Sequence, residues 1–416
     1  MTGGRTRVET DVAIVGAGPA GLAAALALRA AGVGRVTVLE RERDAGGLPR
    51  HSHHTGYGLR DLHRVMSGPD YARHYERRAR AAGVELRTGT MVTGWSEDGG
   101  LDLTAPDGLR TMHASAVLLA TGARERPRAA RLVPGARAQG VYTTGELQQA
   151  VHVHAQSIGT RALIVGAEHV GFSAMMTLRH AGVNALALVT EADRHESYAA
   201  FHLGARALFG TRVLTRTRVA ELRGRDRVSE VVLERDGRRL VLPCDTVVFS
   251  GGWIPDHELA RSRGAGLTPP ARSPSVDATG ATTVPGVFAA GNLCHPVETA
   301  DVAALGGRHT GEAVARRLRE RDDAARRAGV RIETDDALAW VFPDRLRSTA
   351  DLPPGGRLRL RSRISRPLPR ITLTQGDRTL WQRRVPRLVA GRTTTLGCSW
   401  LARLDLDGPP VRVGVG

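Results

Sequence analysis

The stretch DVAIVGAGPAGLAAALALRAAGVGRVTVLE, residues 11–40, decides the fold of this chain. Residues 11–15 form an apolar run rich in β-branched side chains, which predicts a strand buried on both faces of a sheet. Gly16, Gly18 and Gly21 follow at the spacing G-x-G-x-x-G, where a helix of Ala and Leu begins. Such a turn lets a pyrophosphate approach the backbone, and the N–H groups at the helix start favour its charge.

Glu40 closes a second predicted strand, over residues 36–39. A carboxylate at this place accepts hydrogen bonds from ribose hydroxyls, so the pattern predicts a dinucleotide with a free 2′-hydroxyl. The stretch contains, in this order, a strand, the glycines, a helix, a second strand and an acidic residue. This order distinguishes the stretch from a helix start that is merely rich in Gly and Ala.

The composition indicates a folded chain of two or three domains, with 416 residues and a net charge of +17. The sequence contains no Lys, so every Lys/Arg position is Arg, and we interpret these arginines as interspersed with Asp and Glu rather than gathered in a tail. Few aromatic residues are present to stack on bases. We therefore expect a solvated basic surface and no nucleic-acid binding, while an anionic substrate, an acidic partner subunit or a lipid surface stays open.

Cysteine usage excludes several classes of site. Cys244, Cys294 and Cys398 lie far apart and form no paired motif, which speaks against a disulfide framework, a redox-active disulfide, an iron–sulfur cluster and a zinc site. The first predicted strand begins close to Met1, without room for a signal peptide, and no apolar run is long enough for a transmembrane segment. We expect a cytoplasmic protein with no metal site.

A histidine-rich loop, LPRHSHHTGYGLRDLHR, follows the doublet Gly46-Gly47. His51, His53 and His54 have the wrong spacing for a metal on one helix face, and no carboxylate or Cys pair completes a ligand set. The loop either lines a cofactor or substrate pocket and moves protons near neutral pH, or is a polar surface loop. The sequence does not decide between these two.

A second unit repeats the first. Its elements follow the order of the first unit: a strand over 162–165, the motif GAEHVG over 166–171, a helix, and a further strand over 185–189. Glu168, however, replaces the middle glycine. A carboxylate facing a pyrophosphate costs on the order of 1–4 kcal/mol per like-charge contact. The second turn therefore either binds a nucleotide in a shifted pose or is a structural relic.

The acid of the second unit is Glu191, which follows the strand over 185–189. It favours NAD over NADP, and the nearby Arg194 weakens that preference.

Thr121-Gly122 follow the predicted strand 116–120. A further strand, predicted over 284–291, leads into Asn292 and a helix over 300–318. From residue 335 onward the period-two alternation predicts an all-β domain, a small sandwich with no catalytic group.

The motifs together resemble the pyridine nucleotide–disulfide oxidoreductase superfamily, whose members carry two dinucleotide domains. The likeness runs over residues 8–320, through GAGPAG, LLATGARERPR and VPGVFAAGNLCHP. GGLPRHSHHTGYGL, TTGELQQ and GAEHVGFSAMMTLRHAG followed by VTE are similar to the FAD subunits of hydrogen cyanide synthase, opine oxidase and dye-linked proline dehydrogenase.

This resemblance implies an α/β fold with two Rossmann-like dinucleotide-binding domains of three layers and a small C-terminal all-β domain. The expected boundaries are 1–150 and 258–330 for the FAD-binding domain, 151–257 for the inserted NAD(P)-like domain and 335–416 for the C-terminal domain. The resemblance implies FAD contacts by Gly16, Gly18, Pro19, Ala20, Gly21, Glu40, Gly47, Thr121, Gly122, Gly291 and Asn292. Gly166, Glu168, Gly171 and Glu191 would form the second nucleotide site.

Four departures from the family pattern limit the chemistry. Asn292 stands where the superfamily usually has Asp, which keeps a hydrogen bond and removes a charge. The paired redox cysteines are missing, which excludes disulfide reduction. Ser52 stands where narrow relatives often have Cys, and no Cys-rich iron–sulfur extension follows.

We therefore expect an FAD-dependent oxidoreductase, a subunit of a dehydrogenase or oxidase that acts on an amine, an imino acid or a similar small molecule. It would work in an oligomer with a second flavoprotein subunit. The alternatives are a stand-alone NAD(P)H-dependent reductase and a non-catalytic subunit that holds a nucleotide. His51, His53, His54 and His295 are the candidate acid–base groups, and Cys294 is either reactive beside a flavin or a core thiol.

Overall fold

The computed structural model describes the chain except residues 1–5, 198–206, 208–209, 270 and 321–327. The described chain divides into two compact units. Unit 1 contains residues 1–50, 56–123 and 255–416, and unit 2 contains residues 51–55 and 124–254. Unit 1 thus holds the first glycine turn together with the C-terminal strands, and unit 2 holds the second turn.

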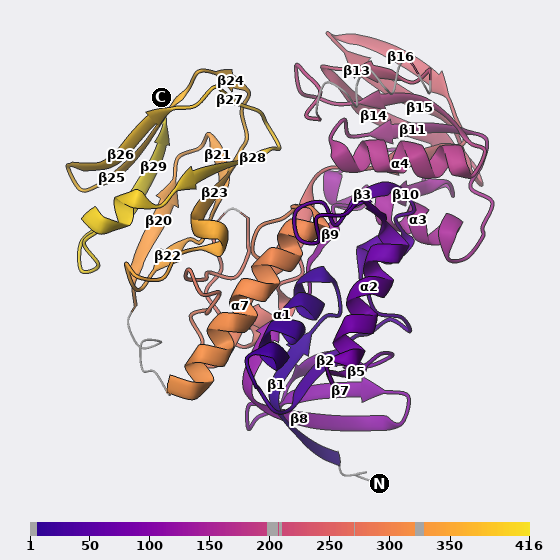
Figure 1. Cartoon of the computed structure of the whole chain (residues 1–416). Helices are drawn as coiled ribbons and strands as arrows, with labels where there is room; N and C mark the ends of the chain where they lie inside the picture. Colours follow the sequence, from indigo (N-terminus) through magenta and orange to yellow (C-terminus); the bar gives the residue numbers. More distant parts are fainter. Residues whose placement is uncertain (1–5, 198–206, 208–209, 270, 321–327) are drawn as a thin grey trace. The chain divides into compact units, whose positions relative to one another are not determined.

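A mixed sheet forms the centre of the first part of unit 1, in the order β5-β2-β1-β8-β7-β6, with β19 beside β8 (Figure 1). β1 pairs in parallel with β2 and β8, and β7 continues the sheet in antiparallel pairing. The strands are β1 (Thr6–Val15), β2 (Val36–Leu39), β5 (Glu85–Arg87), β6 (Met91–Trp95), β7 (Leu101–Ala105), β8 (Gly108–Leu119) and β19 (Val287–Ala289).

The two faces of β1 have different partners because successive side chains of a strand alternate. Val12 and Ile14 pack in a core with helices α1 (Pro19–Ala30), α2 (Gly68–Ala81) and α7 (Ala300–Glu320). Ala13 and Val15 face the opposite core, with residues of β7 and of the C-terminal strand β21 (Leu338–Phe342). The sheet is therefore covered on both sides, as its apolar sequence predicts.

Several predicted elements match the structure, and one is shorter. β2 covers the predicted residues 36–39, and α7 contains the helix predicted over 300–318. The strand expected over 284–291 is reduced to β19. Pro285-Gly286 form a turn before it, in which the N–H of Val287 donates to Val284 O and Gly286 has φ +76°.

Unit 2 has three layers. Its parallel sheet has the order β10-β17-β11-β12-β13, with helices packed on one face and the antiparallel sheet β14-β15-β16 on the other. The elements are β10 (Val141–Thr143), α3 (Thr144–His152), β11 (Arg161–Val165), α4 (His169–His180), β12 (Asn184–Val189), β13 (Arg212–Leu214), β14 (Thr217–Gly224), β15 (Val228–Arg235), β16 (Arg238–Pro243) and β17 (Thr246–Phe249).

The C-terminal part of unit 1, drawn in orange to yellow in Figure 1, contains two larger sheets around one apolar core and a two-stranded sheet, β24-β27. One sheet has the order β22-β20-β29-β25-β26, and the other has the order β21-β23-β28. The strands are β20 (Val330–Thr334), β21 (Leu338–Phe342), β22 (Arg345–Leu346), β23 (Arg357–Ser362), β24 (Arg366–Pro367), β25 (Arg370–Gln375), β26 (Arg378–Arg384), β27 (Arg387–Leu388), β28 (Thr393–Gly397) and β29 (Val411–Val415).

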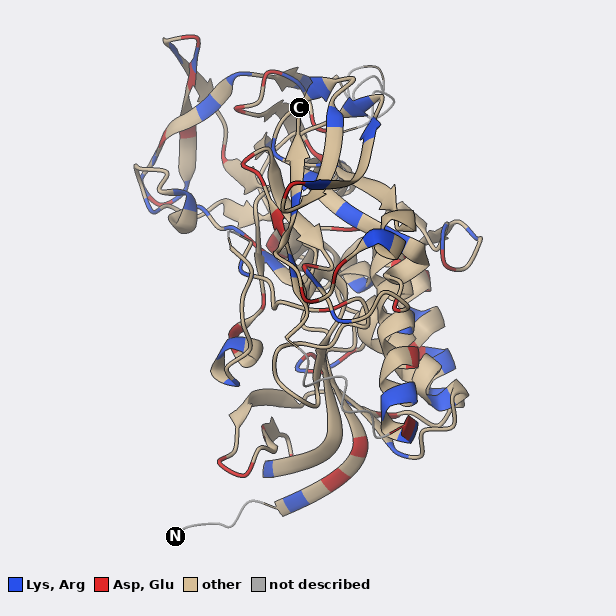
Figure 2. Cartoon of the chain, turned by 90° about the vertical axis from the view of Figure 1, so that its left-hand side faces the viewer, with Lys and Arg blue, Asp and Glu red and all other residues tan. Residues whose placement is uncertain are grey.

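The short elements connect these layers. They are β3 (Thr55–Tyr57), β4 (Met66–Ser67), β9 (Ala123–Glu125), β18 (Trp253–Pro255) and helix α6 (Glu258–Ser262). Basic and acidic positions are interspersed over much of the chain, but the C-terminal strands differ: residues 357–403 contain twelve Arg and one acid, Asp377 (Figure 2). None of the described helices is both long and apolar enough to cross a membrane. The α/β class with a strand-rich C-terminal domain is confirmed.

Candidate functional site

The first glycine turn connects β1 to α1 very tightly. Gly16 has φ +104°, and a Cβ atom there would lie 2.5 Å from the carbonyl oxygen of Ala120. A Cβ atom on Gly21 would lie 2.0 Å from the carbonyl oxygen of Gly16. Side chains at either position would collide with backbone, so the turn requires glycine at both.

The N-terminus of α1 is open. Gly18 is the N-cap residue, and within the described chain no side chain caps it and no acid lies in the first turn. A Cβ atom built on Gly18 meets nothing within 4 Å. The first backbone N–H groups of α1, from Ala20 onward, therefore face space beside Gly18, and the helix dipole makes this space favourable for an anion.

The Glu40 carboxylate lies beside this turn and is held by backbone. Its Oε2 accepts from the N–H of Ala17 at 2.9 Å, and its Oε1 accepts from the N–H of Glu42 at 3.0 Å. Glu40 is buried, yet each carboxylate oxygen can accept a second hydrogen bond. Glu40 is thus oriented with acceptor capacity left for ribose hydroxyls.

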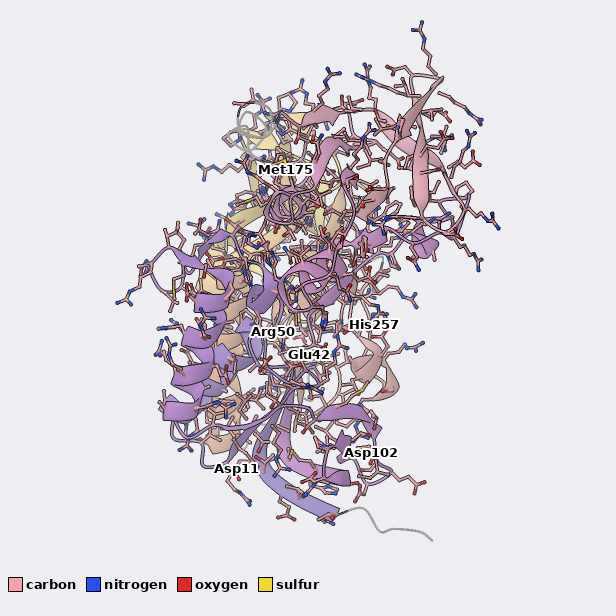
Figure 3. The ribbon with its side chains drawn as sticks, turned by 90° about the vertical axis from the view of Figure 1, so that its right-hand side faces the viewer. Asp11, Glu42, Arg50, Asp102, Met175 and His257 are labelled. Carbon is pink, nitrogen blue, oxygen red and sulfur yellow. The ribbon has the colours of Figure 1, made fainter. Side chains whose placement is uncertain are left out.

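The loop after Glu40 folds back over the turn. The N–H of Gly46 donates to Ala17 O at 2.8 Å, and Gly47 lies against Gly18. Figure 3 labels Glu42 and Arg50 at the two ends of this loop, and their side chains approach to 3.8 Å. Arg50 also donates to Asp44 O at 2.7 Å. The loop therefore forms one wall of the open space.

Thr121 and Gly122 join two distant segments of unit 1. Thr121 Oγ1 donates to Asp256 O at 2.8 Å, and the N–H of Asp256 donates to Gly122 O at 3.0 Å. Both residues follow β8 directly, next to β1 in the sheet. They therefore fix the place where the chain leaves unit 1 and returns to it.

Gly291 lies against the first turn of α1, and Asn292 follows it. A Cβ atom on Gly291 would approach the Ala20 side chain to 2.6 Å. The Asn292 amide donates to Glu298 O at 3.1 Å and accepts from the Glu298 N–H at 2.8 Å. Asn292 thus uses its side chain to shape the loop that leads into α7.

The start of α7 carries a polar cluster that sequence reasoning did not identify. Asp301 accepts from the Arg60 N–H at 3.2 Å and from the Val302 N–H at 2.9 Å. The Arg60 guanidinium donates to Thr299 Oγ1 at 3.0 Å. Arg60 and Asp301 are separated by 241 positions of sequence, and no local pattern connects them.

The C-terminal strands also reach this loop. Trp340 Nε1 donates to Pro296 O at 2.8 Å, and Arg361 Nη1 donates to Val297 O at 2.7 Å. The ring of His295 packs edge-on against Phe342, with centroids 4.6 Å apart. Sequence reasoning gave the C-terminal domain no part in the site, because no motif there indicates one.

The second glycine turn has the same backbone geometry as the first, but a side chain caps the helix that follows it. Gly166 has φ +131°, and a Cβ atom on Gly171 would lie 2.4 Å from Gly166 O. Glu168 is the N-cap residue of α4 and accepts from the N–H groups of Val170 at 2.6 Å and Gly171 at 3.0 Å. Glu191 follows β12 at the surface. A dinucleotide pyrophosphate does not fit this turn as it stands.

A family model for pyridine nucleotide-disulphide oxidoreductases matches residues 10–307. The chain belongs to the pyridine nucleotide-disulphide oxidoreductase family. Its members are FAD-dependent oxidoreductases, and the family uses FAD and NAD(P)H. The open turn and Glu40 of unit 1 fit the adenine dinucleotide of FAD, while the second turn disagrees with the family's use of NAD(P)H.

Curated relatives support this membership. The ferredoxin reductase component of chlorobenzene dioxygenase from Cupriavidus sp. is 31% identical over 298 residues, which are 68% of this chain and 67% of that protein. An opine oxidase subunit of Rhizobium meliloti is 28% identical over 313 residues, 68% of this chain and 58% of that protein. The chain therefore matches about two thirds or less of these proteins' own length.

A solved thioredoxin reductase from T. acidophilum has the same fold. It covers 74% of this chain and 99% of its own, with a TM-score of 0.64 and 22% identity. Unlike a disulfide reductase, this chain has no cysteine pair: Cys244, Cys294 and Cys398 all lie in the described chain and are unpaired. Burial raises the pKa of the Cys294 thiol, so this thiol is protonated at neutral pH. The expected oxidoreductase without a redox disulfide is confirmed.

The four candidate histidines belong to different units. His295 lies in unit 1, where burial first and Arg359 second lower its pKa to about 3, so it is neutral at physiological pH. His51, His53 and His54 lie in unit 2. His53 stacks on His152 of α3 at 4.0 Å, and His54 Nδ1 lies 2.8 Å from Thr55 O. Their assignment as acid–base groups stays a prediction.

Proposed function

We propose that this chain is the FAD-carrying subunit of a dehydrogenase or oxidase that acts on an amine, an imino acid or a similar small molecule. The observation that carries the proposal is the open N-terminus of α1 beside Glu40, in a chain similar to an opine oxidase subunit. Bound FAD supplies the redox chemistry, and the protein supplies binding, orientation and electrostatics.

The residues that would hold FAD all belong to unit 1. The α1 N-terminus would bind the pyrophosphate, Glu40 the adenosine ribose, and the Gly291-Asn292 backbone the remaining part of the molecule. The complete set is Gly16, Gly18, Pro19, Ala20, Gly21, Glu40, Gly47, Thr121, Gly122, Gly291 and Asn292. At the N-terminus of α7 the Asp301 carboxylate of the first turn lies 3.8 Å from the Arg60 guanidinium, so the two charges offset each other at the proposed flavin end.

The relatives support the proposed subunit role. Two of them are components of multi-subunit systems, a dioxygenase and an opine oxidase. In our proposal this chain likewise works with a second flavoprotein subunit in an oligomer, and exchanges electrons with it. The three unpaired thiols are compatible with a reducing compartment, and we place the protein in the cytoplasm.

A second candidate function is an NAD(P)H-dependent flavoprotein reductase. The observation that favours it is the 31% identity to a ferredoxin reductase component. A reductase of this kind requires that NAD(P)H reduce the flavin directly. The third candidate function is a non-catalytic subunit that holds a nucleotide, for which no reductant should reduce the flavin.

Anaerobic reduction of the FAD-loaded protein separates the three. The chain is purified by itself and in complex with any flavoprotein that co-purifies, and each sample is mixed with NADH, NADPH or a series of N-alkylated amino acids. We expect the flavin absorbance to bleach in the complex with an amino acid and to stay unchanged with NAD(P)H. Rapid bleaching of the isolated chain by NADH would instead establish the reductase. No bleaching by any reductant would establish the holding subunit.

A further inference from the structure

The two glycine turns of this chain provide an internal comparison. Gly18 and Glu168 are the N-cap residues of α1 and α4, and both have an extended backbone, with φ −76° and ψ −176° at Gly18 and φ −100° and ψ −179° at Glu168. The surrounding glycines also make the same close approaches, of Gly21 to Gly16 and of Gly171 to Gly166. The turns differ at the N-cap side chain.

That side chain occupies the anion position of the second turn. The two Glu168 oxygens accept from the N–H groups of Val170 and Gly171, and Ser250 Oγ donates to Oε1. At the first turn the equivalent N–H groups meet no capping side chain within the described chain. The carboxylate thus takes the hydrogen bonds and the helix-dipole attraction that a phosphate would otherwise receive.

We propose that Glu168 acts as an internal anion that replaces the pyrophosphate and closes unit 2 to NAD(P)H. In this proposal unit 2 has the fold of a dinucleotide-binding domain but binds no dinucleotide at its glycine turn. Electrons then enter and leave the FAD of unit 1 by a route other than NAD(P)H bound at this turn. This consequence rests on the proposed function, while the closure itself rests on the geometry of the turn.

The neighbourhood strengthens the closure. Glu125 places a second, half-buried carboxyl group in the same unit, where its Oε2 accepts from the N–H of Gly145 at the start of α3. The cation of this neighbourhood, Arg131, donates to the carbonyl oxygens of Ser250 and Gly251 and balances the carboxylates. An incoming pyrophosphate would meet the like charge of the Glu168 carboxylate and a guanidinium that already has partners.

Affinity for a redox-inert probe tests the proposal. The oxidised, FAD-loaded protein is titrated calorimetrically with ADP-ribose, which contains the pyrophosphate and no nicotinamide, and with NAD⁺. We expect Glu168→Gly to bind both at least tenfold more tightly than the original chain, which corresponds to about 1.4 kcal/mol. Glycine is nearly as good an N-cap as an acidic residue, so α4 should remain folded in this variant.

Two further variants separate the effect of the side chain that fills the anion position from the effect of its charge. Glu168→Gln keeps the size and one acceptor but removes the charge, so it should bind ADP-ribose more tightly than the original chain and less tightly than Glu168→Gly. Glu221→Gln removes an exposed carboxylate from β14, paired with Arg223, and should leave the affinity unchanged. Equal gains at residues 168 and 221 would contradict a local closure and point to net charge alone.

The reciprocal substitution tests the same rule at the first turn. Gly18→Glu places a carboxylate where a Cβ atom meets nothing within 4 Å, so the side chain can cap α1. We expect this variant to purify without FAD, while Gly94→Glu, which adds a carboxylate at an equally open position on β6, should retain it. Full FAD occupancy in Gly18→Glu would overturn the rule that an N-cap carboxylate excludes a pyrophosphate.

The outcomes distinguish the two proposals. If the original chain binds ADP-ribose as tightly as folded Glu168→Gly and Glu168→Gln do, the closure is wrong and the nucleotide binds in a shifted pose. If the variants gain affinity but no co-purifying flavoprotein or amino-acid substrate reduces the flavin, the closure stands and the proposed function fails. Circular dichroism of each variant confirms that it is folded.

Discussion

Glu40 and Glu168 show how one residue type serves two opposite purposes. Glu40 closes β2, where backbone N–H groups of Ala17 and Glu42 orient it and leave acceptor capacity for a ribose. Glu168 stands at the N-cap of α4, where it saturates the N–H groups themselves. A carboxylate beside the turn supports dinucleotide binding, whereas a carboxylate in the turn opposes it.

Glu125 makes unit 2 sensitive to pH. Burial, opposed by the hydrogen bond from Gly145, raises the pKa of Glu125 from 4.5 to about 7 in the folded chain. The folded state therefore holds a proton that the unfolded state releases between pH 4.5 and 7. Its stabilising contribution is complete below pH 4.5 and is lost as the pH rises through 7, a loss on the order of 3 kcal/mol.

Glu125→Gln should remove this dependence, because its amide oxygen still accepts from Gly145 and does not ionise. Urea unfolding of unit 2, followed between pH 4.5 and 7.5 by hydrogen exchange of α3, measures the slope in both proteins. Glu230→Gln, at the surface of the same unit, is the control and should keep the original slope. An unchanged slope in Glu125→Gln would show that another group carries the proton.

At the scale of elements, β21 and β23 hold the loop between β19 and α7. Their side chains donate to two successive carbonyl oxygens, those of Pro296 and Val297. Asn292 holds the same loop from within, through Glu298. The C-terminal strands therefore act on the segment that, in our proposal, meets the flavin end of FAD, and their role includes site support.

Trp340→Phe tests this support. The variant keeps an aromatic ring against His295 but loses the hydrogen bond to Pro296 O and leaves that carbonyl without its partner. We expect unit 1 to lose about 1–3 kcal/mol of unfolding free energy and to release FAD faster during dialysis. Trp381→Phe on β26, which packs beside the C-terminal core, is the matched control. An equal loss of FAD in the control would show that general destabilisation is the cause.

At the scale of the whole molecule, the chain contains two dinucleotide-type units and, in our proposal, one dinucleotide. Ligand binding stabilises the unit that binds it by mass action, by about 2.7 kcal/mol at a free concentration of 100 times the dissociation constant. Calorimetric melting with and without FAD should therefore move the transition of unit 1 to higher temperature and leave that of unit 2 in place.

Excess NAD⁺ provides the complementary measurement. It should move neither transition in the original chain, because Glu168 closes unit 2. A shift of the unit 2 transition by NAD⁺ would contradict the closure, and a shift of both transitions by FAD alone would contradict the assignment of one cofactor to one unit.

The sequence by itself determined what depends on local spacing. The glycines at 16, 18 and 21, the acid at 40 and the β-branched strands specify a turn, two strands and a helix within 30 residues, because backbone sterics and side-chain periodicity act over short distances. The alternation after residue 335 predicted the C-terminal strands for the same reason. The replacement at Glu168 was also visible as a break in a repeated motif.

Tertiary structure decided everything that depends on distant segments. It brought Arg60 to Asp301, and it brought Trp340 and Arg361 to the loop before α7. It also paired β20 with β29 at the end of the chain. Above all, it showed that the Glu168 carboxylate turns back onto its own helix. Sequence could show an acid at that place, but the direction of a side chain and the donors it meets are fixed by the packed backbone around it.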